Sequence, residues 1–185
     1  MNTGGPGQSA LLLLDVVALL LREKVNYAVI GAVAAAVYGA VRASLDADAV
    51  LSLTTGSARS LERAFAAAGL HTQLRLGDAD DPIPGLLALT DGFGNRVDLL
   101  IGLRGLEPAA FSRTIEVPFQ GQSLRFIGRE DFVAMKVFAG GPQDIADAEQ
   151  VIAAAQDAID LSLLRRLAAR YGRAAAENLE QLLQS

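Results

Sequence analysis

Residues 42–53 read Arg-Ala-Ser-Leu-Asp-Ala-Asp-Ala-Val-Leu-Ser-Leu. In the second half of this stretch apolar side chains alternate with acidic or small ones, which predicts a strand with a two-residue repeat. Asp46 and Asp48 then point to the same face of the strand, with their Cα atoms roughly 6.5–7 Å apart. Two carboxylates in such positions repel each other unless a cation lies between them. Because hard divalent cations such as Mg²⁺ prefer carboxylate oxygens, the pair predicts a metal site.

A third acidic residue, Asp98, lies in another apolar stretch. Residues 96–101 read Arg-Val-Asp-Leu-Leu-Ile, and an isolated aspartate inside such a strand is costly unless it finds a partner or serves a site. On a neighbouring strand, Asp98 would join Asp46 and Asp48 in a two-metal site for phosphoryl-type transfer. The alternative is that these acids are only solvated at strand edges, since Asp-x-Asp pairs are common by chance.

The rest of the chain alternates between helical and strand patterns. Helices are expected at 9–24, 31–38 and 58–68, strands at 26–30, 46–53, 71–76, 86–90, 96–101, 111–118 and 122–127, and further helices from 129 almost to the end. The sequence Asp-Gly-Phe-Gly-Asn at 91–95 predicts a hairpin turn, because Gly and Asn tolerate positive φ. This order predicts an α+β (α/β) fold, with a mixed sheet flanked by helices. We expect a flexible N-terminus at 1–8, a core at 9–128 and a C-terminal helical region at 129–185 that packs on the core.

The composition excludes several classes of function. The 185 residues include no Cys, so disulfides, thiolate metal sites and cysteine nucleophiles are excluded. Sixteen Lys and Arg against 21 Asp and Glu give a net charge of −5, which argues against broad, charge-driven binding of nucleic acid. The apolar run at 10–21 contains Asp15 and is shorter than the ~20 residues that span a bilayer. We therefore expect a cytoplasmic protein with no membrane segment.

One stretch of sequence leads into Asp46 and Asp48, and a second follows Asp98. Both have the residue spacing of a known family. Residues 27–32 (Tyr-Ala-Val-Ile-Gly-Ala), a helix and then 38–48 (Tyr-Gly-x-x-Arg-x-Ser-x-Asp-x-Asp) resemble the opening of the nucleotidyltransferase superfamily. More narrowly, they resemble its toxin-like branch, related to abortive-infection and minimal nucleotidyltransferase proteins. The helix at 130–136, which ends in Lys136, and the stretch 139–147 are similar to that branch's lysine helix and Arg-x-Lys-Asp-x-x-Asp stretch. The resemblance covers residues 27 to about 168.

This resemblance implies transfer of a nucleoside monophosphate from a nucleoside triphosphate to an acceptor hydroxyl. It implies that Asp46 and Asp48 hold Mg²⁺ (or Mn²⁺), and that Asp98 completes the metal site and helps to deprotonate the hydroxyl. Residues implied to contact the nucleotide or its phosphates are Gly31, Ala32, Arg42, Ser44 and Lys136, and Asp144 is implied to support Arg42 or Lys136.

The chain also departs from the family pattern. Ala32 stands where Gly or Ser is usual, and Gly141 and Gln143 stand where Arg and Lys are usual. These changes keep the acids but remove contacts to phosphate, so an active enzyme and a catalytically impaired domain that binds nucleotide or protein both stay open.

The acceptor is open as well. It could be an RNA end or a protein hydroxyl, as in a toxin with a cognate antitoxin. That is the leading hypothesis; the alternative is a small molecule, as in antibiotic-modifying nucleotidyltransferases, whose cationic substrates the acidic net charge would attract.

Overall fold

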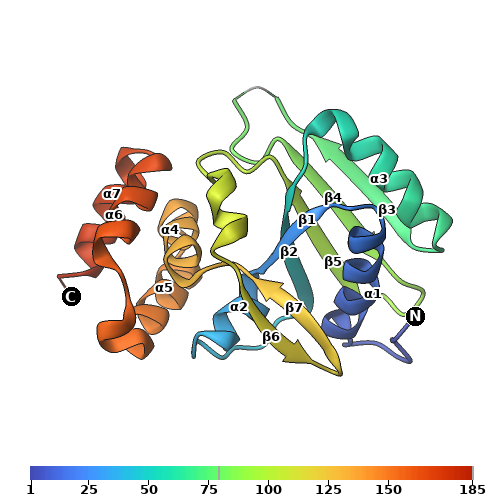
Figure 1. Cartoon of the computed structure of the whole chain (residues 1–185), viewed down its shortest axis with the longest axis horizontal. Coiled ribbons are helices and arrows are strands. Elements are labelled where there is room, and N and C mark those ends of the chain that lie inside the picture. Colours follow the sequence, from blue (N-terminus) through green and yellow to red (C-terminus); the bar gives the residue numbers. More distant parts are fainter. Residues whose placement is uncertain (79, 185) are drawn as a thin grey trace.

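The structure, a computed structural model, describes residues 1–78 and 80–184 and contains a seven-stranded mixed sheet flanked by helices (Figure 1). The strand order is β3-β4-β5-β2-β1-β7-β6. The strands are β1 (Asn26–Ile30), β2 (Asp46–Ser52), β3 (His71–Leu76), β4 (Gly85–Thr90), β5 (Arg96–Ile101), β6 (Ile115–Phe119) and β7 (Gln122–Phe126). The helices are α1 (Ser9–Arg22), α2 (Gly31–Val37), α3 (Thr55–Ala67), η1 (Pro108–Ser112), α4 (Arg129–Ala139), α5 (Pro142–Ala155), η2 (Gln156–Ala158), α6 (Leu161–Arg170) and α7 (Arg173–Leu182). The predicted fold class is confirmed.

Two helices cover one face of the sheet. Helix α1 packs against β1, β2 and β5, and α3 packs against β3 and β4 (Figure 1). Along β2, Ala47 and Ala49 are fully buried, whereas Asp46 and Asp48 are only partly buried. Because side chains alternate between the two faces of a strand, the two aspartates lie on the face opposite these alanines.

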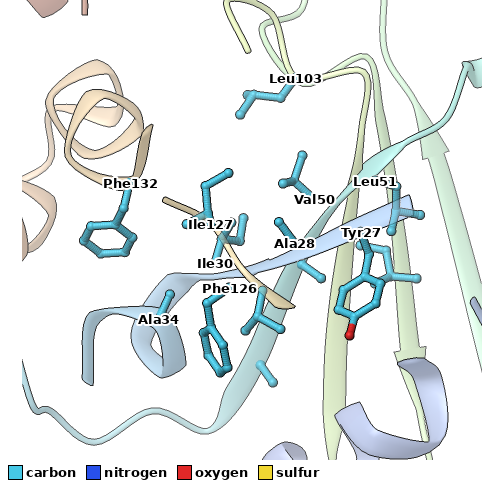
Figure 2. Packing of buried hydrophobic residues seen from close by; sticks show 14 of the residues in the cluster. Tyr27, Ala28, Ile30, Ala34, Val50, Leu51, Leu103, Phe126, Ile127 and Phe132 are labelled. Atoms are coloured by element: carbon cyan, nitrogen blue, oxygen red, sulfur yellow. The ribbon is translucent and has the colours of Figure 1, made fainter. Parts of the chain in front are cut away.

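Helices α4 to α7 form a second layer beside the sheet. Helix α4 contacts α5, α6 and α7, and the layer lies at the end of the molecule that carries the C-terminus (Figure 1). Figure 2 shows Phe132, on α4, in the same view as Ile30, at the end of β1, and Ile127, which follows β7. All three side chains belong to the buried apolar cluster, so the helical layer and the sheet share one core.

The first connection between the two layers consists of two hydrogen bonds made by the backbone of Ile127. The amide of Ile127 donates to the carbonyl of Val29 over 3.0 Å, and the hydroxyl of Tyr38 donates to the carbonyl of Ile127 over 2.6 Å. These bonds fix the chain where it leaves the sheet and enters α4.

Two further connections are ionic. In the first, here named the Arg113 cluster (Glu107, Arg113, Asp131 and Arg166), Arg113 donates to Asp131 over 2.7 Å and to Glu107 over 2.8 Å. Arg166 on α6 donates to the same Glu107 over 3.0 Å. In the second, Arg42 on the loop before β2 pairs with Asp147 on α5 over 3.1 Å.

Several details differ from the sequence predictions. The strand expected at 111–118 begins only at Ile115, because Pro108 opens a short helical turn that includes Phe111; proline favours that first helical position. In the stretch 1–8, whose flexibility stays a prediction, Asn2 bonds to Asp15, and the amide of Gln8 donates to Asn95 over 2.6 Å. The 91–95 turn joins antiparallel β4 and β5 as predicted.

None of the helices in the described residues is long and apolar enough to cross a bilayer. Ser185, the last residue of the predicted helical region, lies outside the part of the chain that the structure describes.

Candidate functional site

The three aspartates singled out in the sequence lie on one face of adjacent strands. β2 and β5 pair in parallel, with Asp48 directly opposite Asp98 and Asp46 opposite Arg96. Residues paired in register point to the same face, so Asp98 shares the face of Asp46 and Asp48. We name these three residues the acid face.

Gly31 brings the chain close to the acid face. Ile30 pairs with Asp48 across β1 and β2, and the chain then turns into α2 with Gly31 at φ +65°. A Cβ atom at Gly31 would lie 2.9 Å from Cγ of Asp48 and closer still to its Oδ2. Only glycine fits here, for both its backbone angle and its lack of a side chain. The space at Asp48 Oδ2 therefore depends on Gly31.

Burial, followed by the negative charges of Asp98 and Asp46, raises the pKa of Asp48 to about 6. Lys136 and Arg42 act in the opposite direction but do not cancel this effect. Within the described part of the chain, no hydrogen bond or ion pair is made to the carboxylates of Asp46 and Asp48. The acid face therefore carries negative charge that the protein leaves partly unbalanced.

Asp98, in contrast, has a protein partner. Arg96 donates from Nε to Oδ1 of Asp98 over 2.8 Å and from Nη2 to Oδ2 over 3.0 Å. Among the described residues, no three acids or histidines are arranged to hold a metal ion as they stand. Sharing of one ion by all three aspartates thus stays a prediction.

The residues of the acid face nevertheless suit a divalent cation. All three supply carboxylate oxygens, the donors that Mg²⁺ prefers. Among the residues that the structure describes, two of the three carboxylates accept no hydrogen bond, and Gly31 leaves room beside Asp48.

Two cations from distant parts of the chain lie near the acid face. Lys136 Nζ on α4 lies 2.7 Å from Asp144 and 2.8 Å from Asp147 on α5. Asp147 also pairs with Arg42 and accepts a bond from Gln143 over 2.9 Å. Burial by itself would raise the pKa of Asp147. The hydrogen bonds that its carboxylate accepts, of which the one from Lys136 has the largest effect, outweigh burial and lower this pKa. Asp147 is therefore a charged anchor for both cations.

A cavity of about 550 Å³ is lined by Asp48 of the acid face and by both cations, whereas Asp46, Asp98 and Asp147 are not among its lining residues. Gly31, Arg42, Asp48, Lys136 and Asp144 line one part of it. The remaining wall is apolar and consists of Ile30, Pro82, Ile83, Leu100, Leu103, Phe132, Met135, Phe138 and Ala139. The cavity thus combines a charged end with an apolar end, as small-molecule sites commonly do.

Two of the implied phosphate contacts are not among the residues that line this cavity. Ser44 is exposed, and its hydroxyl donates to the backbone carbonyl of Asp46 over 3.0 Å. Ala32 is only 4% exposed. Sequence reasoning also gave no role to Asp147 or Arg96. The three-residue spacing of Asp144 and Asp147 on a helix was the available signal for Asp147.

Comparisons with known proteins concern the fold. No family model matches the chain, and no curated protein matches its sequence. The chain has the nucleotidyltransferase fold. The antibiotic-resistance factor ANT(2'')-Ia superposes with a TM-score of 0.60 at 13% identity, over 94% of this chain and 95% of that one.

Two more solved structures share this fold. ANT(2'')-Ia in complex with adenylyl-2''-tobramycin covers 87% of this chain and 97% of that one, with a TM-score of 0.60 at 12% identity. The lincosamide antibiotic adenylyltransferase LnuA, bound to lincomycin, gives a TM-score of 0.50 at 12% identity, covering 80% of this chain and 98% of that one. The superposition with ANT(2'')-Ia covers 94% of this chain. The similarity of fold therefore extends into the helical layer.

Proposed function

We propose that this chain is a Mg²⁺-dependent nucleotidyltransferase that moves a nucleoside monophosphate from a nucleoside triphosphate to a hydroxyl of a small molecule. The observation that carries the proposal is the register of β2 and β5, which puts Asp48 directly opposite Asp98 on the face that also holds Asp46. The fold, shared with adenylyltransferases, supports it.

Each residue of the site has a part in this reaction. Asp46 and Asp48 hold the divalent ion, which supplies a positive charge against the triphosphate when bound. The acceptor oxygen forms a bond to the α-phosphorus while the bond from that phosphorus to pyrophosphate breaks. Asp98 accepts the proton of the hydroxyl.

Cations and backbone complete the site. Lys136 and Arg42, anchored on Asp147, offset the charge of the phosphates. Helix α2 has only seven residues, and the dipole of so short a helix contributes little to phosphate binding. The role of Gly31 is therefore to leave room beside Asp48. Gln143 and Gly141 provide no positive charge, so Lys136 on α4 and Arg42 on the loop before β2 supply it in their place.

The cavity favours a small-molecule acceptor over a macromolecular one. Its volume of about 550 Å³ lies within the roughly 300–1,000 Å³ of small-molecule sites. The neighbours of this fold bind adenylyl-2''-tobramycin and lincomycin.

A labelling experiment tests the proposal. The pure protein is incubated with Mg²⁺ and each α-labelled nucleoside triphosphate, with tobramycin, lincomycin or a mixed RNA pool as acceptor. We expect label on a small molecule, and at least a ~100-fold loss with Asp46→Asn, which removes an ion-binding carboxylate.

The other outcomes identify the alternatives. Label on RNA or on protein would keep the transferase but exclude the small-molecule acceptor, as in a toxin that an antitoxin restrains. Nucleotide binding with no transfer to any acceptor would indicate a catalytically impaired domain.

A further inference from the structure

Arg96 is a cation inside the acid face. It pairs with Asp46 in the register of β2 and β5, two positions before the Asp48–Asp98 pair along the ladder. Its guanidinium binds both carboxylate oxygens of Asp98, at 2.8 and 3.0 Å. Such a planar, two-bond contact with a carboxylate is the geometry that arginine, and not lysine, provides. Both oxygens through which Asp98 would hold a metal ion are thus bound to Arg96.

The backbone around Arg96 is fixed by a serine. The amide of Arg96 donates to Ser9 Oγ over 3.0 Å, and the hydroxyl of Ser9 donates to the carbonyl of Leu45, directly before Asp46. Ser9 is 6% exposed, so these bonds are sheltered from water. One hydroxyl therefore ties the start of β5 to the start of β2 and holds Arg96 opposite Asp46.

The guanidinium itself can leave. The side chain of Arg96 is 42% exposed, against 17% for Asp98. Solvent can therefore take up the guanidinium when another cation replaces it, at modest cost. With Arg96 in place, the three carboxylates and one guanidinium carry a formal charge of −2, which one divalent ion neutralises.

We propose that Arg96 and a divalent ion compete for Asp98, so that the free protein binds one ion through Asp46 and Asp48 while Arg96 keeps Asp98 occupied. This inference rests on the metal site of the proposed function. It accounts for the finding that Asp98 faces the two other acids but forms no three-acid ion site with them in the described residues. Asp98 becomes available only when the guanidinium moves.

Binding of Mn²⁺ without nucleotide tests the competition. The probe is Mn²⁺ alone, measured by the electron paramagnetic resonance signal of the free ion at pH 7.5. Arg96→Gln removes the competing cation, and we expect about tenfold tighter Mn²⁺ binding. Arg63→Gln on α3 is the matched control, because Arg63 is exposed on the helix that covers other strands and the net charge changes equally.

A second pair of variants separates competition from general electrostatics. Asp98→Asn alone is expected to change Mn²⁺ affinity by less than about twofold, because Arg96 already occupies that carboxylate. In the Arg96→Gln background the same change is expected to abolish the tenfold gain. If Arg96→Gln behaves like Arg63→Gln, or if Asp98→Asn weakens binding equally in both backgrounds, the competition is refuted.

Two checks keep the result interpretable. Should Arg96→Gln not fold, Arg96→Lys, which cannot make the two-bond contact, is expected to bind Mn²⁺ more tightly than wild type; an affinity equal to wild type would overturn the inference. Asp48→Asn tests the site itself. If it leaves Mn²⁺ binding unchanged, the metal site of the proposed function fails, whatever Arg96 does.

Discussion

The acid face and the Arg113 cluster both gather carboxylates away from solvent, but they balance them differently. In the Arg113 cluster, hydrogen bonds from Arg166 and then Arg113 lower the pKa of Glu107 to about 2. On the acid face, burial and neighbouring acids raise the pKa of Asp48 to about 6. Balanced charges connect layers of the fold, whereas unbalanced charges provide a place for a ligand cation.

We expect the largest effect on stability when a cation of the Arg113 cluster is removed and its carboxylates lose their balancing charge. Arg113→Met leaves Asp131, whose side chain is 3% exposed, without its ion-pair partner. We expect a loss of about 3–5 kcal/mol in the free energy of unfolding, measured by urea denaturation at pH 7. Arg165→Met removes an arginine from an exposed pair with Glu180, and should cost less than about 1 kcal/mol. Equal costs would show that the cluster does not hold the layers together.

Closing the space beside Asp48 should have an intermediate effect. Gly31→Ala adds a Cβ against Asp48 at φ +65°, and we expect about 2–3 kcal/mol of destabilisation together with weaker Mn²⁺ binding. Gly69→Ala is the matched control, because Gly69 has φ +89° and no atom within 4 Å of an added Cβ. The control should cost about 1 kcal/mol from the backbone alone. Equal losses in the two variants would mean that contact with Asp48 is unimportant.

Removing the unbalanced charge should stabilise the fold. The pKa of Asp48 is about 6 in the folded protein and 3.8 as a free group, so ionisation of Asp48 lowers stability as pH rises from about 4 to 6. Asp48→Asn is expected to raise the free energy of unfolding by about 1–2 kcal/mol at pH 8, in the presence of a chelator, and by nothing at pH 3.5. Asp78→Asn, at an exposed acid, should show no such dependence. A destabilised Asp48→Asn at pH 8 would contradict the raised pKa.

Local sequence patterns predicted the elements of the sheet well. The bounds of β1, β3 and β5 match the expected strands, because a short apolar run, as in β1, and an alternation of apolar and polar residues are both patterns of neighbouring residues. The prediction of a strand at 111–118 was wrong at its start, because Pro108 opens a helical turn that includes Phe111.

The partners within the site could not be predicted in the same way. The sequence identified Asp46, Asp48 and Asp98, but their register depends on the pairing of strands separated by α3, β3 and β4. Arg42 and Asp147 are 105 residues apart, and no local pattern relates them. Arg96 lay in the quoted strand, yet its contact with Asp98 follows from side-chain geometry rather than from residue type.

The attachment of the helical layer bears on how wide the cavity can be. Its charged end lies between the sheet, which carries Asp48, and α4, which carries Lys136. Several separate stretches of chain join these layers, among them the Ile127 backbone bonds, the Arg113 cluster and the Arg42–Asp147 pair. Any widening must therefore stretch at least one joint. Of these joints, the Arg42–Asp147 pair includes a residue that lines the cavity, Arg42, so entry and exit of a large molecule would strain the loop before β2.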